Sequence, residues 1–187
     1  MKKIMVHLAT GFEEMEVIIP VDIWKRAGFQ VQLVSVTGNK VVTGAHAIPI
    51  VADLLFEEAD YSNADLLFLP GGMPGASNLD AHKGLQKKIL EHNQKGKNLA
   101  AICAAPLILG HNNLLKSKRA TCYPGYEKDL WGAIVTGNSI EIDGNIVTGK
   151  GPGVAFEFAM RITEMFIGRD AAMKLAAAMQ VSPSIIP

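Results

Sequence analysis

Hydrophobic residues along this 187-residue chain gather in short runs that alternate with amphipathic stretches. Four of the runs, "KIMVHL", "QVQLVSV", "DLLFLP" and "NLAAIC", have the length of a strand and are bounded by Gly, Pro or Asn. Helical patterns lie between them. This alternation predicts βαβ units and a mostly parallel sheet, so we expect an α/β fold. No repeat or low-complexity linker divides the chain, and one domain over residues 1–187 is expected.

The first helical pattern runs from about Glu13 to Ala27. Acidic residues occupy its first turn, Lys25 and Arg26 its last, and Gly28 follows, as the helix dipole and C-cap preferences favour. Pro20 lies inside the pattern and predicts a kink there.

Two segments interrupt the parallel pattern. "VVTGAHAIPIV" is typical of a small hairpin around Gly44, and "SIEIDGNIVTG" alternates with period two around Asp143 and Gly144. The chain then continues with two helical patterns separated by Gly168. The sheet should therefore carry small antiparallel additions and end in a helical pair.

Charge and cysteine content argue against a nucleic-acid-binding protein, a membrane protein and a disulfide-rich protein. Eighteen basic and eighteen acidic residues cancel and are interspersed, so nucleic-acid binding by charge is not expected. The start of the chain lacks the features of a signal peptide, and no apolar run reaches the roughly 18 residues of a membrane helix. Cys103 and Cys122 are too few for a disulfide framework. We expect a protein of the cytoplasm without membrane contact.

The segment "GKNLAAICAAPLILG", residues 96–110, places Cys103 between a strand-like run and a helical run. A nucleophile at such a sharp turn needs small residues two positions before and after it, because the backbones approach closely. Ala101 and Ala105 meet this need, and Pro106 is tolerated in a first helical turn. The position also favours a thiolate. The alternative is that Cys103 is a small buried hydrophobic residue.

Two further segments offer groups that could act on the same site. Gly71 and Gly72 follow a strand directly, and their amides, with that of Ala104, could form an oxyanion site, although a simple βα turn explains them as well. Glu16 precedes the apolar residues 17–19, where the helix should turn inward. A carboxylate there needs a partner or a proton; otherwise Glu16 is a solvated helix residue.

Other chemistries are excluded. "GNIVTGKG" ends in glycine where a phosphate-binding loop places Ser or Thr, and G-x-G-x-x-G is absent. No pair among the five histidines and two cysteines has zinc spacing, and isolated surface histidines are the ordinary explanation. Neither a cofactor nor a metal is expected.

Four separated segments, "GFEEMEVIIPVDIWKRAGF", "LPGGMPGASNL", "AAICAAP" and "GKGPGVAFEFA", resemble in this order the ThiJ/PfpI superfamily, in its parkinsonism-associated deglycase-like subfamily. The resemblance spans nearly the whole chain. It implies a flavodoxin-like three-layer sandwich with helices on both faces of the sheet, and a homodimer. It also implies a reactive cysteine, here Cys103, that hydrogen-bonds a first-helix glutamate, here Glu16, with oxyanion amides from Gly72 and Ala104.

One departure from the family concerns a histidine that many members carry after the elbow helix. Here the corresponding stretch is "RATCYPGY", with Tyr123 in that place. Tyr123 could donate a hydrogen bond to substrate, but with an ordinary pKa of about 10 it is a poor base at neutral pH. His111, eight residues from Cys103, should lie roughly 12 Å away. Strand alternation would turn Cys122 away from the site, so no disulfide with Cys103 is expected.

The resemblance implies glyoxalase or deglycase activity on a small reactive carbonyl or a glycated adduct. A protonated Glu16 would donate to a Cys103 thiolate, since an ionised carboxylate would oppose that thiolate, and the pair would titrate as a unit. The alternative is a non-enzymatic oxidative-stress sensor or redox chaperone in which Cys103 becomes a sulfinate. A protease is disfavoured, because its amine leaving group needs an acid that is usually histidine.

Overall fold

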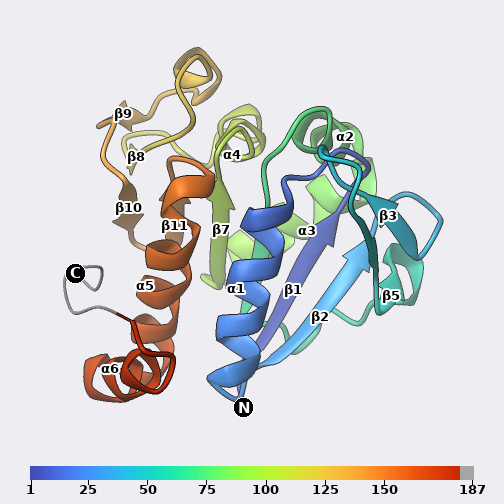
Figure 1. Cartoon of the computed structure of the whole chain (residues 1–187). Helices are drawn as coiled ribbons and strands as arrows, with labels where there is room; N and C mark the ends of the chain where they lie inside the picture. The colour runs from blue at the N-terminus through green and yellow to red at the C-terminus, as the bar shows by residue number, and fades with distance from the viewer. Residues whose placement is uncertain (182–187) are drawn as a thin grey trace.

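A seven-stranded sheet lies at the centre of the computed structural model, which describes residues 1–181 (Figure 1). Its strands are β1 (Lys3–Leu8), β2 (Gln30–Ser35), β5 (Leu54–Leu55), β6 (Leu66–Leu69), β7 (Asn98–Ile102), β10 (Ile140–Asp143) and β11 (Ile146–Gly149). They lie in the order β10-β11-β7-β6-β1-β2-β5. All neighbouring pairs are parallel except β10 and β11, so the prediction of a mostly parallel sheet is confirmed.

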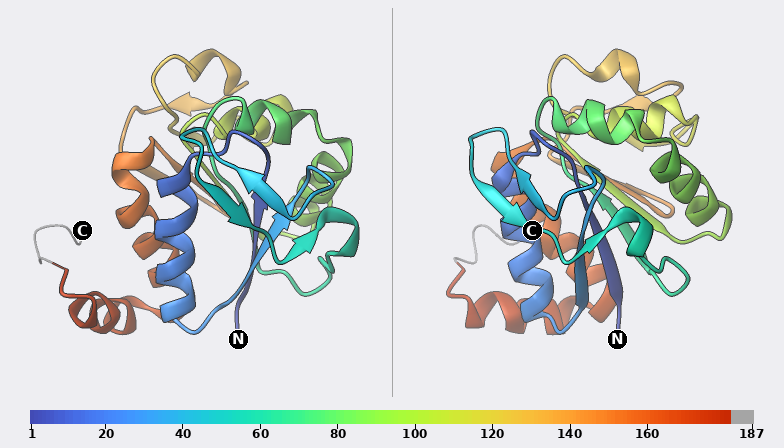
Figure 2. Two further views of the ribbon diagram at one scale, coloured as in Figure 1. Left: turned by 45° about the vertical axis from the view of Figure 1, so that its right-hand side comes forward. Right: turned by 90° about the vertical axis from the view of Figure 1, so that its right-hand side faces the viewer.

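Helices cover both faces of the sheet and complete a three-layer sandwich (Figure 2). One face carries α1 (Glu14–Arg26), α5 (Ala155–Ile167) and α6 (Arg169–Ala178), and the other carries α2 (Gly75–Ala81), α3 (Lys83–Gln94) and α4 (Pro106–His111). Within residues 1–181, no helix combines the length and the apolar character that crossing a membrane requires.

The core consists of two apolar layers, one on each side of the sheet. Along β1, Ile4, Val6 and Leu8 pack into the layer beneath α1 and α5, whereas Met5 packs into the layer beneath α2, α3 and α4. Successive side chains of a strand point to opposite faces, and a central parallel strand is buried on both of them. The continuous apolar runs of the sequence are the consequence of this double burial.

The smaller elements lie outside the central sheet. Strands β3 (Val41–Thr43) and β4 (Pro49–Val51) form the antiparallel hairpin expected around Gly44, and β10 with β11 forms the second expected hairpin. A short parallel pair, β8 (Arg119–Ala120) and β9 (Ile134–Val135), was not predicted. Three single-turn helices complete the described chain: η1 (Phe56–Glu58), η2 (Glu127–Asp129) and η3 (Pro152–Val154).

Helix α1 begins and ends where its sequence pattern indicates. The Glu13 carboxylate caps its start by accepting a hydrogen bond from the Glu16 amide at 2.8 Å. The helix continues through Pro20 and ends before Gly28, whose φ of +79° suits a glycine. Gly168 separates α5 from α6, as expected.

Three functional segments leave the sheet at the same edge. Residues 11–16 follow β1, Gly71 and Gly72 follow β6, and Cys103 follows β7, and these three strands are neighbours. Because the carboxyl ends of parallel strands meet at one edge, their loops converge there.

Candidate active site

Cys103 occupies a sharp turn immediately after β7. Its φ is +64°, a left-handed conformation that costs a residue with a side chain about 1 kcal/mol or more. Its amide donates to the Gly149 carbonyl at 2.9 Å, which holds the turn against β11. Ala101 and Ala105, two positions away on each side, are fully buried. The expected strand-to-helix elbow is present, and Cys103 at its tip is 8% exposed.

Glu16 is fully buried one turn into α1 and faces this elbow. Its Oε2 accepts a hydrogen bond from the Gly71 amide at 2.8 Å. Its Oε1 is buried without a hydrogen bond of regular geometry from any residue in the range 1–181. The Cys103 thiol lies close enough for the pKa of each group to depend on the other. The structure therefore brings together the cysteine and the glutamate that the sequence singled out.

Gly71 makes this approach possible because it has no side chain. A Cβ at this position would lie 2.5 Å from Cys103 Cβ and 2.7 Å from Glu16 Oε2, closer than real Cβ contacts. Gly72, with a φ of +84°, packs against the backbone of Gly11 and Glu13. Both glycines are therefore required by the close packing of three loops, which the sequence alone did not distinguish from an ordinary turn.

Glu16 keeps its proton at neutral pH. Burial raises the pKa of Glu16 to about 8, and the nearby charge of Glu13 acts in the same direction. The hydrogen bonds from the Gly71 amide and with the Cys103 thiol only partly oppose these effects. A neutral carboxyl can donate a hydrogen bond to the neighbouring Cys103 sulfur.

The ionisation of Cys103 depends on the state of Glu16. Burial, and next the charge of an ionised Glu16, raise the pKa of Cys103 to about 12, while hydrogen bonds from the Gly72 and Ala104 amides lower it. When Glu16 is protonated, the repulsion is absent and the carboxyl can stabilise a thiolate instead. The two groups therefore titrate as a pair, and the thiolate beside a protonated acid stays a prediction for this site.

The amides of Gly72 and Ala104, the two oxyanion donors predicted from the sequence, reach the Cys103 sulfur. Backbone donors that converge on one point stabilise negative charge that develops there. This place can receive the oxygen of a carbonyl attacked by the sulfur, or oxygens added to the sulfur itself.

Tyr123 lies in a turn rather than a strand, because β8 ends at Ala120. The strand-alternation argument for Cys122 was therefore wrong in its premise. The Tyr123 amide donates to the Cys103 carbonyl at 2.8 Å, while its half-exposed side chain lines an apolar hollow of about 290 Å³ with Pro124 and residues 150–154. Cys122 is a free thiol in the core layer on the opposite side of the sheet from Cys103.

The histidines are not all at the surface, contrary to expectation. His7 and His92 are buried, and burial is the largest effect lowering the pKa of each to about 4. His7 lies between the Phe68 carbonyl and the Tyr61 hydroxyl, both at 3.1 Å, which makes it a neutral core residue. His111 pairs with Asp80 at 2.8 Å.

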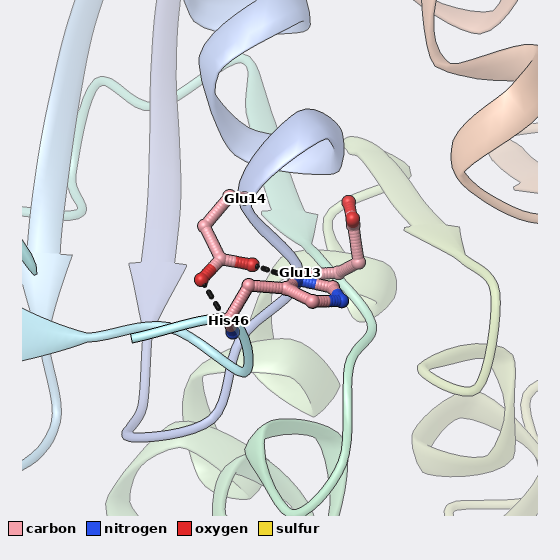
Figure 3. A group of neighbouring side chains, drawn as sticks. All are labelled: Glu13, Glu14 and His46. Atoms are coloured by element: carbon pink, nitrogen blue, oxygen red, sulfur yellow. Dashed lines mark hydrogen bonds and ion pairs between the residues drawn. The ribbon is translucent and has the colours of Figure 1, made fainter. Parts of the chain in front are cut away.

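A group that the sequence did not reveal consists of Glu13, Glu14 and His46, whose ligand-type atoms lie within 4.8 Å of one another (Figure 3). The two glutamates were interpreted as ordinary first-turn acids, yet Glu14 is only 4% exposed. No spacing rule for metal ligands joins a glutamate to a histidine 32 positions away, so the sequence did not predict that Glu14 and His46 meet. Both Glu14 oxygens accept hydrogen bonds from His46, so the group is a hydrogen-bonded contact between α1 and the β3–β4 turn.

Comparison with known proteins matches the model of the DJ-1/PfpI family to residues 2–165. Protein DJ-1 homolog B of Arabidopsis thaliana is 36% identical over 98% of this chain, which spans only 42% of that protein's length. A Pyrococcus abyssi protein named as a deglycase is 34% identical over 81% of this chain and 91% of its own. The structure of oxidized Toxoplasma gondii DJ-1 is 30% identical, with a TM-score of 0.92 over 97% of this chain and all of that one. These matches confirm the resemblance and the flavodoxin-like fold.

Proposed function

We propose, from the premise that this chain belongs to the DJ-1/PfpI family, that it is a Cys103-dependent enzyme acting on small reactive carbonyls or their glycated adducts. The observation that carries the proposal is the fully buried Glu16 carboxyl, which lies close enough to the Cys103 thiol for the two to share a hydrogen bond. The deglycase name of the Pyrococcus relative supports this substrate class.

The reaction begins with attack of the Cys103 thiolate on the carbonyl carbon. The carbonyl oxygen gains the electron pair and accepts hydrogen bonds from the Gly72 and Ala104 amides, and the Glu16 proton then neutralises it to give a hemithioacetal. With a glyoxal, the Glu16 carboxylate removes the proton from the former carbonyl carbon and returns it to the neighbouring carbon. The hydroxyl proton passes to the oxygen of that neighbouring carbon, so the electron pairs shift to leave the thioester of a hydroxy acid. Water hydrolyses the thioester to a hydroxy acid and restores the thiol.

Tyr123 has a supporting part in this proposal. Its side chain borders the apolar hollow beside the elbow, from which its hydroxyl donates a hydrogen bond to bound substrate. It is not the base, since a phenol is almost fully protonated at neutral pH.

We further propose a cytoplasmic homodimer. A free thiol at Cys103 requires a reducing compartment. The exposed apolar residues Met15 and Ile18 on α1, and Ile48 and Val51 beside it in the β3–β4 hairpin, offer a surface for a second copy. Sedimentation of the wild type and of Ile18→Glu tests the dimer, which the charge should weaken.

Turnover of methylglyoxal tests the enzyme. The wild type and Cys122→Ala should consume methylglyoxal with release of a hydroxy acid, whereas Cys103→Ala should not. Equal consumption by the Cys103 variant, or none by the wild type, would contradict the enzymatic proposal.

A redox sensor is the second candidate, because amides that hydrogen-bond the sulfur can also hold sulfinate oxygens. Two equivalents of peroxide would oxidise the thiolate to sulfinate and release water. Mass spectrometry should then show two oxygens on Cys103 and none on Cys122. This clean product in a protein without carbonyl turnover would favour the sensor.

A further inference from the structure

The Glu14 side chain leaves α1 and enters the turn between β3 and β4 (Figure 3). Its Oε1 accepts hydrogen bonds from the His46 amide at 2.7 Å and the Ile48 amide at 3.4 Å, and its Oε2 contacts His46 Nδ1 at 2.7 Å. The turn has a glycine at Gly44, where a Cβ would overlap the Glu14 carboxyl. The turn and the carboxylate thus fit each other closely.

Backbone hydrogen bonds join the same turn to the segment that precedes α1. Gly11 donates to the Thr43 carbonyl and Ala45 donates to the Phe12 carbonyl, each at 2.8 Å. On its other side this segment meets the site, because the Glu13 amide donates to the Gly71 carbonyl at 3.0 Å. Residues 11–16, which include Glu16, therefore lie between the β3–β4 turn and the Gly71–Gly72 loop beside Cys103.

We propose that His46 is a positioning residue for the Cys103 site. Through Glu14 it fixes the first turn of α1, and this turn holds the Glu16 carboxyl against the Gly71 amide and the thiol. The proposal rests on the proposed function in one respect, that the Glu16 proton controls the reactivity of Cys103.

The hydrogen-bonded contact of Glu14 with His46, called the clamp below, depends on pH because both side chains can carry a charge. The hydrogen bond and charge of Glu14, with a smaller effect of Glu13, raise the pKa of His46. Burial would raise the pKa of Glu14, but its hydrogen bonds with the His46 side chain and the turn amides lower it overall. The ion pair is therefore complete below the ordinary His46 pKa and is lost as the pH rises through the raised value. A neutral His46 keeps only the hydrogen bond.

The experiment measures the alkylation rate of Cys103 by iodoacetamide against pH in the full chain, followed at that residue by mass spectrometry. His46→Ala removes the clamp. His46→Asn keeps a donor near the Nδ1 position without the charge. His82→Ala is the matched control, because His82 caps α3 by accepting from the Leu85 amide, on the other side of the sheet.

His46→Ala should slow alkylation at pH 7 about threefold, which corresponds to a rise of about half a unit in the apparent pKa of Cys103. His46→Asn should recover the wild-type rate above the pKa of His46 but not below it. His82→Ala should lose stability and keep the wild-type profile. Profiles of both His46 variants that coincide with the wild type would overturn the proposal, and so would a shift of the wild-type profile by a chelator, which would indicate a bound cation.

A double-variant cycle separates this proposal from the proposed function. In a Glu16→Leu background, His46→Ala should cause no further shift, because the clamp acts through Glu16. If Glu16→Leu alone leaves the profile unchanged, the proposed function fails. If Glu16→Leu shifts it and His46→Ala does not, only the positioning role fails.

Discussion

The two cysteines are both buried but differ in backbone conformation and in the donors that reach the sulfur. Both are free and less than one-tenth exposed, and burial is the largest effect raising the pKa of each thiol. Cys103 has a left-handed backbone, two amides that reach its sulfur and a buried acid beside it. Burial and then the charges of Glu127 and Asp129 raise the pKa of Cys122 to about 11, with no backbone donor among residues 1–181 to oppose them.

The comparison separates two properties of a thiol, its burial and the presence of hydrogen-bond donors at its sulfur. A buried sulfur becomes reactive where fixed donors replace the water that it has lost, and it remains inert where only apolar groups and acidic charges surround it. The donors at Cys103 come from backbone geometry, which the turns at residues 71–72 and 103–105 impose.

The largest expected effect is a contrast in labelling between the two cysteines. Iodoacetamide at pH 7 should modify Cys103 at least about a hundredfold faster than Cys122, because only the first has groups that stabilise a thiolate. Peptide mass spectrometry on the wild type, Cys103→Ala and Cys122→Ala measures both rates. Similar rates at the two positions would remove the distinction between them.

Gly71→Ala should damage the Cys103 site through packing alone. The added Cβ would meet Cys103 and Glu16, so we expect a loss of about 3 kcal/mol in the free energy of unfolding and much slower labelling of Cys103. Urea unfolding measures the first effect. Gly153→Ala is the matched control, since a Cβ there meets nothing within 4 Å, and its stability should change by no more than about 1 kcal/mol.

Glu16→Gln should change how stability depends on pH. The pKa of Glu16 is about 8 in the folded protein against 4.5 as its ordinary value, so its contribution is complete below pH 4.5 and is lost as the pH rises through 8. Between pH 5 and pH 9 the wild type should lose about 4 kcal/mol relative to the glutamine variant, at about 1.4 kcal/mol for each pH unit between 5 and 8. Urea unfolding at both pH values checks this, and parallel losses in the two proteins would show that Glu16 titrates normally.

Tyr123→Phe should have the smallest effect. If the hydroxyl contacts only substrate, methylglyoxal turnover falls about threefold while iodoacetamide labelling of Cys103 stays unchanged. Steady-state kinetics beside labelling separates the two quantities. A change in labelling would instead place the hydroxyl at the sulfur.

The sequence predicted those features that depend on neighbouring residues. Period-two alternation and flanking turn residues revealed both hairpins, and the small neighbours of Cys103 indicated the elbow. The contact of Glu14 with His46 joins positions 32 apart and follows no spacing rule, so only the folded chain reveals it. The prediction of a strand at Tyr123 was wrong, because β8 has only two residues and ends at Ala120. It therefore does not determine which way the side chains of Cys122 and Tyr123 point. The family resemblance, rather than the pattern, identified the role of Glu16.

The left-handed backbone of Cys103 also bears on how this protein can evolve. A glycine at that position would relieve the strain of about 1 kcal/mol, so selection for folding alone would favour replacing the cysteine. Stability and chemistry therefore oppose each other at a single residue. Variants selected only for heat resistance should accumulate Cys103→Gly, whereas selection for the proposed carbonyl turnover should retain the sulfur.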